Sequence, residues 1–531
     1  MIVPLTPIRC LYRAVDLYGK KVGVVSGESR FTYGQFGERC ERLAAGLKAH
    51  GIQRGDRVAF LSFNNNQLLE GYYAAPLIRA VVMPLNVRLT APELIQILNH
   101  AGARMLVFEN DFAPMIDAFR KMCPQIERYV SIDSKIPQVD LVFEELLTNG
   151  RIDRPDIFSF DENEIAELFY TSGSTGTPKG VMLSHRTLYL HALSVCCGID
   201  QHDYGVELHT IPLFHANGWG RPQTATLNGM KQVMVRRFDP VHVFRLIQDE
   251  RATGMAVVPV MANAMLNCPE ITNYDFSSLR EIFIGGAASS VELIARMEKA
   301  FGCDVMAGYG LTETCPVATA ATDKDTVRYA DDEDRQRHKA MAGWPGVGCE
   351  VRVVDAHMQD VARDMQAIGE VVIRGDNVME GYYKEPESTR EAITNGWLHT
   401  GDMAVWDEEN YIHIVDRKKD IIISGGENIS SIEIEKAIFA HPAVLECAVV
   451  SAPDPRWGEI PAAFVVRKPG HNLNEPELLA FLEARLAKFK LPKQMHFVDG
   501  PLPKTGTGKI LKRELREQFW QGYERRVQGS L

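Results

Sequence analysis

A short run of hydroxyl and glycine residues, ending in a lysine, holds the first side chains in this sequence that could do chemistry. Glycines let backbone N–H groups approach phosphate oxygens closely, while hydroxyls add donors and lysine adds a positive charge. A flexible Ser/Gly linker is disfavoured, because the run is short and lies between the apolar segments 166–169 and 181–183. The sequence therefore predicts a phosphate-binding loop made of Thr171, Ser172, Gly173, Ser174, Thr175, Gly176, Thr177, Pro178 and Lys179.

This loop differs from the phosphate loop of the Walker A type. That motif needs glycine directly before its lysine and serine or threonine directly after it. Here Lys179 follows Pro178 and precedes Gly180. The sequence therefore indicates a phosphate loop of another kind.

A second segment, residues 308–314, combines an aromatic ring with a hydroxyl and a carboxylate. The ring of Tyr309 can stack on adenine, Thr312 offers a hydroxyl to phosphate, and Glu313 offers oxygen ligands to Mg²⁺. The alternative is a buried turn whose glutamate is satisfied internally. The position of the segment downstream of a phosphate loop favours the nucleotide interpretation.

The last third of the chain adds a carboxylate and a lysine in glycine-rich surroundings. Asp402 follows Thr-Gly, and each oxygen of a carboxylate can accept a hydrogen bond from a ribose hydroxyl. Residues 503–509 form a glycine-rich loop that ends in Lys509. A lysine there can counter the charge that builds up where a carboxylate meets a phosphate.

Helical and strand-like patterns alternate around these segments. Apolar residues recur at helical spacing over 36–47 and precede the apolar run 58–61, and the apolar run 282–284 precedes a helical pattern at 292–301. Such alternation predicts an α/β fold with a largely parallel sheet. The charged stretch 331–339 is expected to be a solvated loop.

The length of 531 residues predicts more than one domain, because single cores stop growing near ~250–300 residues. The pattern changes at the charged run 416–420, which lies between two strand-like runs. About a hundred residues follow, a usual domain size, with a helix predicted over 475–489. We expect a large domain over 1–416 and a small one over 420–531.

Taken in order, these segments and two others (residues 285–288 and 424–429) resemble the adenylate-forming superfamily. That superfamily includes acyl-CoA synthetases, firefly luciferases and the adenylation domains of peptide synthetases. The likeness spans nearly the whole chain and is specific, because six segments arrive in the family's order. It implies a large N-terminal α/β domain of several subdomains, a hinge at 417–419 and a small mobile α+β C-terminal domain.

The resemblance assigns roles in ATP binding to the N-terminal segments, beginning with the phosphate loop. Tyr309 would flank the adenine and Thr312 would contact the α-phosphate, while Glu313 and Thr171 would hold Mg²⁺. One wall of the adenine and acyl pockets would be formed by Gly285, Gly286, Ala287 and Gly308.

Further roles fall on the C-terminal segments. By resemblance, Asp402 binds the ribose, Arg417 reaches the ribose or the phosphates, and Lys419 is the hinge. Lys509 is the catalytic lysine that bridges the substrate carboxylate and the α-phosphate. The tunnel for the pantetheine arm of coenzyme A would be lined by Gly425, Gly426 and Glu427.

The reaction implied by this resemblance has two steps. The carboxylate of an acid attacks the α-phosphorus of MgATP, which expels pyrophosphate and leaves an acyl adenylate. Catalysis then rests on positioning and charge stabilisation, because two anions must meet. The small domain would next rotate about Lys419, withdraw Lys509 and admit the thiol of coenzyme A to the acyl carbonyl.

Residues 209–219 indicate which acid is used, because they resemble fatty acyl-CoA synthetases that read His-x-Asn-x-Trp. By that resemblance Trp219 gates the acyl tunnel and His215 borders the carboxylate, although such residues are often only part of a core. Arg221 and Gln223 leave a question open: on a helix Arg221 would face away, whereas facing inward it would select a polar acid. We predict a medium- to long-chain fatty acid, with a short, aromatic or functionalised acid as the alternative.

The composition excludes several other classes. A net charge of −11 disfavours a nucleic-acid partner and adhesion to anionic membranes, and no apolar run approaches the ~20 residues of a membrane-spanning helix. The N-terminus has no secretory leader pattern and the C-terminus lacks Ser-Lys-Leu. Ten cysteines without any Cys-x-x-Cys spacing indicate reduced thiols. We expect a cytoplasmic enzyme.

Two alternatives to an acid–CoA ligase stay open at this point. One is an adenylation enzyme that loads a separate carrier protein, since no carrier segment follows in this chain. The other is a nucleotide-binding sensor without turnover, which is disfavoured because Lys509, Glu313 and Asp402 are all present. The resemblance is also compatible with a homodimer.

Overall fold

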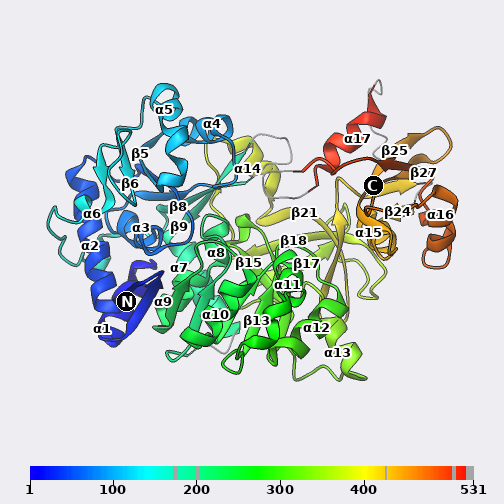
Figure 1. The fold of residues 1–531 in the computed structure, drawn as a ribbon, viewed down its shortest axis with the longest axis horizontal. Coiled ribbons are helices and arrows are strands. Elements are labelled where there is room, and N and C mark those ends of the chain that lie inside the picture. The colour runs from blue at the N-terminus through cyan, green and yellow to red at the C-terminus, as the bar shows by residue number, and fades with distance from the viewer. Residues whose placement is uncertain (172–177, 199–201, 425–426, 505–509, 522–531) are drawn as a thin grey trace. The chain divides into compact units, whose positions relative to one another are not determined.

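The structure is a computed structural model of residues 1–531, which describes all of them except 172–177, 199–201, 425–426, 505–509 and 522–531 (Figure 1). The chain divides into two compact units. The first comprises Met1–Val351, Ile373–Leu398 and Glu409–Tyr411, and the second comprises Arg352–Val372, His399–Glu408 and Ile412–Leu531. The expected α/β fold with a separate C-terminal domain is confirmed. The domain boundary at 416 and the hinge at Lys419 stay predictions.

An eight-stranded sheet in the first unit carries the ends of the phosphate loop. Its strands from β8 to β7 run parallel to their neighbours, whereas β9 and β19 are antiparallel. The order is β19 (Gly381–Tyr382), β9 (Lys179–Ser184), β8 (Ile165–Thr171), β4 (Val81–Pro84), β3 (Arg57–Leu61), β5 (Ala103–Phe108), β6 (Arg128–Ser131) and β7 (Leu141–Val142).

A nine-stranded sheet in the same unit is parallel from β1 through β14, and β2, β15 and β16 add antiparallel edges. The predicted strand at 282–284 is its strand β13, between β14 and β12. The order is β16 (Trp344–Pro345), β15 (Val317–Ala320), β14 (Asp304–Gly310), β13 (Glu281–Ile284), β12 (Gly254–Val257), β10 (Val206–His209), β11 (Lys231–Met234), β1 (Val22–Ser26) and β2 (Ser29–Thr32).

Helices cover both faces of the two sheets, because the strands are apolar on both sides. One core joins the inner faces of the sheets through α1 (Ile8–Tyr18), α2 (Tyr33–Ala49) and α3 (Asn66–Leu77). A second core lies between the nine-stranded sheet and α10 (Pro240–Glu250), α11 (Pro259–Leu266) and α12 (Val291–Phe301). A third lies between the eight-stranded sheet and α4 (Ala91–Ala101) and α5 (Ala113–Met122).

The remaining helices of this unit are shorter or lie nearer to the site. They are α6 (Phe143–Leu146), α7 (His185–Gly198), α8 (Ala216–Trp219), α9 (Arg221–Asn228), α13 (Asp332–Lys339) and α14 (Pro386–Ala392), with the 3-10 turns η1 (Asn110–Phe112), η2 (Ile157–Ser159), η3 (Pro269–Asn273) and η4 (Thr312–Thr314). None of the helices in the described part of the chain is long and apolar enough to cross a membrane.

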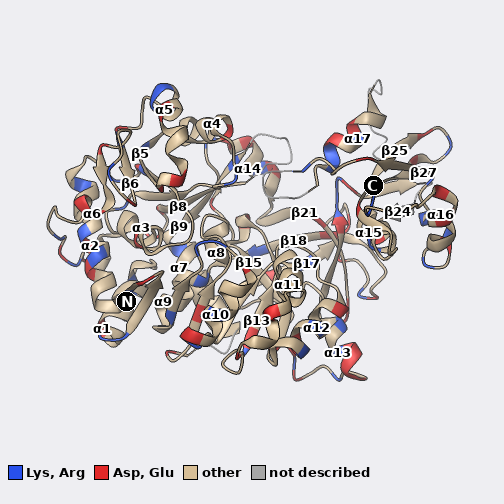
Figure 2. Ribbon diagram, in the orientation of Figure 1, with Lys and Arg blue, Asp and Glu red and all other residues tan. Residues whose placement is uncertain are grey.

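The charged stretch 331–339 is a helix, α13, and the expectation of a loop was wrong. Asp331 caps its start by accepting a hydrogen bond from the backbone N–H of Asp334. The first turn is acidic and the last turn is basic (Figure 2), which complements the helix dipole. Lys339 at its end is buried and pairs with Glu298.

Residues 349–417 supply a five-stranded sheet in the order β17 (Cys349–Val354), β18 (Gly369–Gly375), β21 (Trp397–Trp406) and β20 (Ile393–Thr394), with β22 (Ile412–Arg417) also on β21. The C-terminal sheet has the order β24 (Glu427–Ile429), β23 (Ile422–Ser424), β26 (Gly458–Arg467) and β25 (Val444–Asp454), with β27 (Gln494–Val498) on β26.

Three helices pack on the C-terminal sheet. One face carries α15 (Ser431–Phe439) and α16 (Glu475–Glu483), and the other carries α17 (Lys512–Trp520). The helix predicted over 475–489 therefore ends earlier, at Glu483, and a 3-10 turn, η5 (Lys488–Lys490), follows. Apolar spacing alone did not reveal this break, because Leu486 packs against the same core after the helix has ended.

Candidate active site

The two ends of the phosphate loop face each other across an antiparallel strand pair. Thr171, the last residue of β8, is the partner of Lys179, the first residue of β9. The ammonium of Lys179 lies 4.8 Å from the ring centroid of Tyr382. The loop residues Ser172, Gly173, Ser174, Thr175, Gly176 and Thr177 lie outside the described residues, so their assignment to phosphate stays a prediction.

Tyr382 joins two of the predicted site residues. Its hydroxyl donates a hydrogen bond to Oε1 of Glu313 (2.9 Å), and its ring receives Lys179. Strand β19 brings it there by pairing with β9, opposite Val181. Burial and the neighbouring Glu313 carboxylate raise the pKa of the Tyr382 hydroxyl, which therefore stays a donor. The sequence did not reveal this residue, because a Gly-Tyr-Tyr run has no chemistry of its own.

Glu313 is the described residue that best fits a magnesium ion. Its Oε1 accepts from Tyr382, and its Oε2 accepts no hydrogen bond from the described residues. The described chain contains no group of three or more His, Cys, Asp or Glu side chains that could hold a metal. One carboxylate fits Mg²⁺, which usually takes one or two carboxylates plus substrate phosphates and water; the role of Thr171 as a second ligand stays a prediction.

Close packing explains the glycines of the segment 308–314. A Cβ on Gly308 would overlap the ring of Phe283, and a Cβ on Gly310 would overlap the carbonyl of Pro316. Tyr309 and Thr312 are half-buried at the end of this strand. The following turn is fixed by Asn377, whose amide donates to the carbonyl of Thr314 (2.8 Å).

The segment predicted to receive the acid contains five successive residues with left-handed backbone. Residues 216–220 have φ values of 45°, 39°, 59°, 61° and 72°, and we call them the left-handed turn. Each non-glycine residue in this conformation costs roughly 1–2 kcal/mol. Backbone strain of this kind persists only where surrounding contacts hold it, and it is common at functional sites.

Asn217 stabilises the turn from inside. Its side-chain oxygen accepts from the backbone N–H of Gly220 (2.5 Å), and its amide donates to the buried carboxyl of Glu167 on β8 (3.2 Å). His215, which precedes the turn, is exposed, and its carbonyl accepts from the N–H of Gly218 (3.1 Å).

Asn64 holds the chain that leads into the turn. This buried side chain accepts from the N–H of Leu213 (2.7 Å) and donates to the carbonyls of His209 and Ile211 (both 2.9 Å). Three hydrogen bonds from one amide fix the path of the segment that ends at His215.

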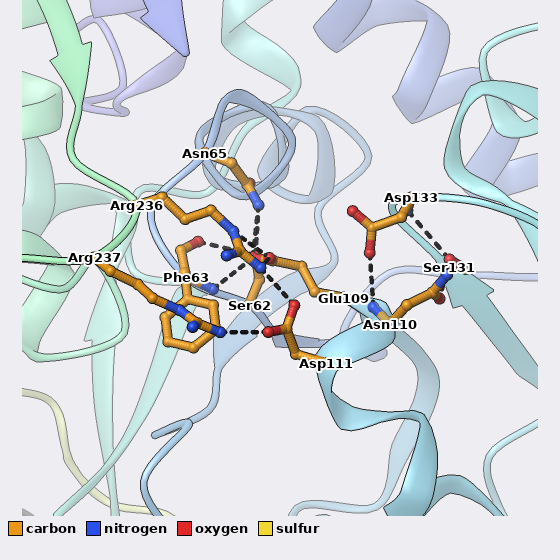
Figure 3. A network of polar contacts seen from close by, with 10 residues as sticks. All are labelled: Ser62, Phe63, Asn65, Glu109, Asn110, Asp111, Ser131, Asp133, Arg236 and Arg237. Atoms are coloured by element: carbon orange, nitrogen blue, oxygen red, sulfur yellow. Dashed lines mark hydrogen bonds and ion pairs between the residues drawn. The ribbon is translucent and has the colours of Figure 1, made fainter. Parts of the chain in front are cut away.

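The loop that carries Asn64 is itself anchored by a polar network around the buried carboxylate of Glu109 (Figure 3). Oε1 of Glu109 accepts from the N–H of Phe63 (2.7 Å) and from the amide of Asn65 (3.0 Å), and Oε2 accepts from Arg236 (2.8 Å). The guanidinium groups of Arg236 and Arg237 lie 4.9 and 4.5 Å from the Phe63 ring centroid. The network therefore fixes the position of the loop residue Asn64.

Trp219 lies against the predicted glycine wall. A Cβ on Gly285 or Gly286 would lie 3.1–3.2 Å from the indole, so these positions leave room for the ring. The indole is 6% exposed and meets Phe283 edge to face, with ring centroids 6.2 Å apart. The side chains that pack around Trp219 are apolar and include Ile211, Ala216, Ala256, Val258, Met261 and Val317. Ala287, in contrast, is exposed.

Arg221 points into an ion-paired cluster, which answers the question about its orientation. It begins α9, and its guanidinium contacts Glu207 on β10 (2.8 Å) and Glu281 on β13 (3.0 Å). Burial lowers the pKa of Arg221, but the two carboxylates raise it by more, so it stays charged. Gln223 donates instead to Glu167 (2.7 Å).

The predicted ribose ligand lies in the second unit, paired with a predicted phosphate ligand. Asp402 on β21 is buried and forms an ion pair with Arg417 on β22 (2.6 Å), its register partner. The carbonyl of Lys419 accepts a hydrogen bond from Arg516 (2.7 Å), and burial lowers the pKa of the Lys419 ammonium.

Three predicted residues of the second unit lie outside the described residues, namely Gly425, Gly426 and Lys509. Glu427 begins β24, where its backbone pairs with Ser424. The roles assigned to these four residues stay predictions.

Known proteins resemble the chain over nearly its whole length. A family model described as AMP-binding enzyme matches residues 11–383, and one described as AMP-binding enzyme C-terminal domain matches residues 433–509. A long-chain-fatty-acid–CoA ligase of Thermus thermophilus is 40% identical over 522 residues, which cover 97% of this chain and 95% of that protein. A peroxisomal butyrate–CoA ligase of Arabidopsis thaliana is 36% identical, with 97% and 93% covered. The solved fatty acyl CoA synthetase of Mycobacterium tuberculosis is 33% identical, with a TM-score of 0.76 and with 97% and 98% covered.

Proposed function

The chain belongs to the AMP-binding enzyme family and is an acid–CoA ligase that works through an acyl adenylate, and we propose that its acid is a medium- to long-chain fatty acid. The observation that carries the proposal is the apolar surrounding of Trp219. An alkyl chain gains free energy by leaving water for such a surface, about 0.8 kcal/mol for each buried CH₂ group.

The engagement of Arg221 supports the same choice. Its guanidinium is held by Glu207 and Glu281, so it does not offer a cation to a second carboxylate on the substrate. The amide of Gln223 is likewise directed to Glu167. The 36% identity to a butyrate–CoA ligase makes a short-chain acid the second candidate.

In the first step, we assign the ATP phosphates to the loop between Thr171 and Lys179. Glu313 and Thr171 would hold Mg²⁺, which would supply positive charge near the phosphate oxygens. Tyr382 orients the Glu313 carboxylate through its hydrogen bond. The remaining nucleotide contacts are assigned to Thr312, Tyr309, Gly286, Ala287, Asp402 and Arg417.

The acid would enter beside the left-handed turn. His215 would border its carboxylate, and Trp219 with Gly285 and Gly308 would line the way for its chain. Lys509 would offset the negative charge as the carboxylate attacks the α-phosphorus.

In the second step, we propose that the small domain rotates about Lys419. This rotation withdraws Lys509 and presents the face near Gly425, Gly426 and Glu427 in its place. The thiol of coenzyme A then attacks the acyl carbonyl, and AMP leaves. We place the enzyme in the cytoplasm, supported by ten free cysteines. Its state as monomer or homodimer is to be measured as a mass in solution.

The test is a panel of acids from acetate to palmitate, with aromatic and dicarboxylic acids, each given MgATP with and without coenzyme A. The expected result is AMP and thioester together, with an optimum among medium- to long-chain acids. An optimum at butyrate or at an aromatic acid would overturn the assignment of the acid. AMP without a thioester would point to a separate carrier protein as the acceptor.

A further inference from the structure

Glu167 is a buried carboxyl group that no cation of the described residues approaches. It lies on β8, on the same face of the strand as Thr171, and its side chain is fully buried. Among the described residues its oxygens accept only two hydrogen bonds, from the amides of Asn217 (3.2 Å) and Gln223 (2.7 Å). Both donors are neutral, so a carboxylate here would be a buried charge without a partner.

The other ionisable groups around Glu167 offer no compensation. In the part of the chain that the structure describes, those that interact with it are Tyr72 on α3 and Cys315, which follows η4. Burial raises the pKa of both groups, and each stays neutral over the working range of pH. An unpaired buried charge costs several kcal/mol, which a carboxyl group avoids by keeping its proton. Burial accordingly raises the pKa of Glu167 to about 8.

Glu167 contacts both the left-handed turn and the helix that follows it. Asn217 lies inside the turn, and Gln223 lies in the first turn of the helix that follows it. One carboxyl group therefore fixes both the strained residues and the start of α9. Its position on β8, four residues before Thr171, also joins this support to the strand that begins the phosphate loop.

His191 on α7 supports the turn from another side. A Cβ on Gly220 would overlap the imidazole, so the ring packs directly on the turn. Its Nε2 accepts a hydrogen bond from the N–H of Val317 (3.2 Å). Burial lowers the pKa of His191 to about 3, so this contact is neutral at working pH and does not titrate together with Glu167.

We propose that Glu167 is a positioning residue for the acid: its protonated carboxyl group fixes the left-handed turn that presents His215 and Trp219 to the substrate. The inference rests on the proposed function only in placing the acid beside this turn. The nucleotide side of the site, around Glu313 and Tyr382, makes no contact with Glu167 among the described hydrogen bonds.

Ionisation of Glu167 is then expected to affect the KM for the acid and not the KM for ATP. Above pH about 8 the carboxyl group loses its proton, which leaves a buried charge without a cation beneath the turn and disfavours the packing around it. We expect the KM for the acid to rise up to about tenfold for each further pH unit, while the KM for ATP stays within about twofold.

The experiment compares the wild-type enzyme with Glu167→Gln, which keeps the size and polarity of a protonated carboxyl group but cannot ionise. kcat and both KM values are measured from pH 6 to pH 10 with the best acid of the panel. The expected result is a KM for the acid near the wild-type value at pH 7, without the alkaline rise. Glu164→Gln, three residues away and paired with Arg79, is the matched control and should keep the rise.

A readout that needs no turnover distinguishes this inference from the choice of acid. The infrared C=O band of a buried protonated carboxyl group is expected in the wild-type enzyme at pH 7 and not in Glu167→Gln. A missing band, or the same alkaline rise in both proteins, would overturn the inference. If no fatty acid is turned over but the band and the pH shift of any accepted acid are present, the proposed acid fails and the role of Glu167 stands.

Discussion

The two sides of helix α9 bury acidic groups in opposite ways. On one side, Glu207 and Glu281 share the guanidinium of Arg221. On the other, Glu167 meets only the amides of Asn217 and Gln223. The burial is similar, with exposed fractions of 1% for Glu207 and 0% for Glu167.

A buried acid can therefore be stabilised either by an opposite charge or by its own proton. A guanidinium keeps its charge at every physiological pH, so the Arg221 cluster is a constant support for strands β10 and β13. The Glu167 site responds to pH, and it supports the turn that we assign to the substrate. The Arg221 cluster thus stabilises the sheet independently of pH, whereas Glu167 stabilises the left-handed turn in a way that depends on pH.

The largest expected effect comes from removing the shared cation. Arg221→Met leaves two buried carboxylates without a partner, and the free energy of unfolding should fall by about 3–5 kcal/mol. Urea unfolding at pH 7 measures it. Arg42→Met is the control, because its ion pair with Glu38 is exposed and should be worth less than about 1 kcal/mol. A loss below about 1 kcal/mol in Arg221→Met would mean that Glu207 and Glu281 take up protons as Glu167 does, so that both sides of α9 bury their acids in the same way.

The second effect is a gain in the free energy of unfolding, where Arg221→Met should give a loss. Glu167 titrates near 4.5 in the unfolded chain and near 8 when folded. Its contribution to stability is therefore complete below pH 4.5 and is lost as the pH rises to about 8. Glu167→Gln does not titrate, so its stability relative to the wild type should rise by about 2–4 kcal/mol between pH 5 and pH 8, at up to 1.4 kcal/mol per unit. Thermal unfolding at several pH values measures it, and a difference that does not change with pH would contradict it.

The third effect separates the side chain of Asn217 from its backbone. Asn217→Ala loses the hydrogen bonds to Glu167 and Gly220, and we expect a loss of about 1–3 kcal/mol and a raised KM for the acid. Asn217→Gly loses the same bonds but adopts the φ of 39° without strain, so it should be more stable than Asn217→Ala by roughly 1 kcal/mol. Equal melting temperatures for the two variants would argue against strain in the turn.

The smallest effect is expected at Gly254, beside the Arg221 cluster, and we compare it with the effect at Gly220 in the left-handed turn. A Cβ on Gly254 would lie 3.4 Å from Arg221, Glu207 and Glu281, an ordinary contact distance, so Gly254→Ala should change the free energy of unfolding by less than about 1 kcal/mol. Gly220→Ala should cost more, because the methyl group would overlap His191 and φ is +72°. The melting temperatures of both variants provide the measurement, and the reverse order would contradict the packing described here.

Much of the fold and part of the site could be predicted from the sequence. Alternating patterns predicted the α/β fold, and short motifs identified Glu313 and Lys179, which the structure brings to the same tyrosine. Tyr382, Glu167 and His191 were missed, because each reaches the site alone from a distant part of the chain. No spacing rule marks a residue of that kind.

The orientation of Arg221 was also beyond sequence reasoning. Helical spacing can be projected onto a face only when the start of the helix is known, and here a left-handed turn delays that start to residue 221. Apolar spacing misled in the same way at α16, where it extended the helix beyond Glu483.

The left-handed turn has a consequence for how the molecule folds. Its backbone is unfavourable on its own, and its supports lie far away in the chain: Glu167 is 50 residues from Asn217, and Asn64 is 149 residues from Leu213. Such a segment cannot nucleate locally and gains its contacts only after both sheets have formed. The acid end of the site is thus the last part to be built, and substitutions at Asn217 should speed unfolding while leaving the refolding rate unchanged.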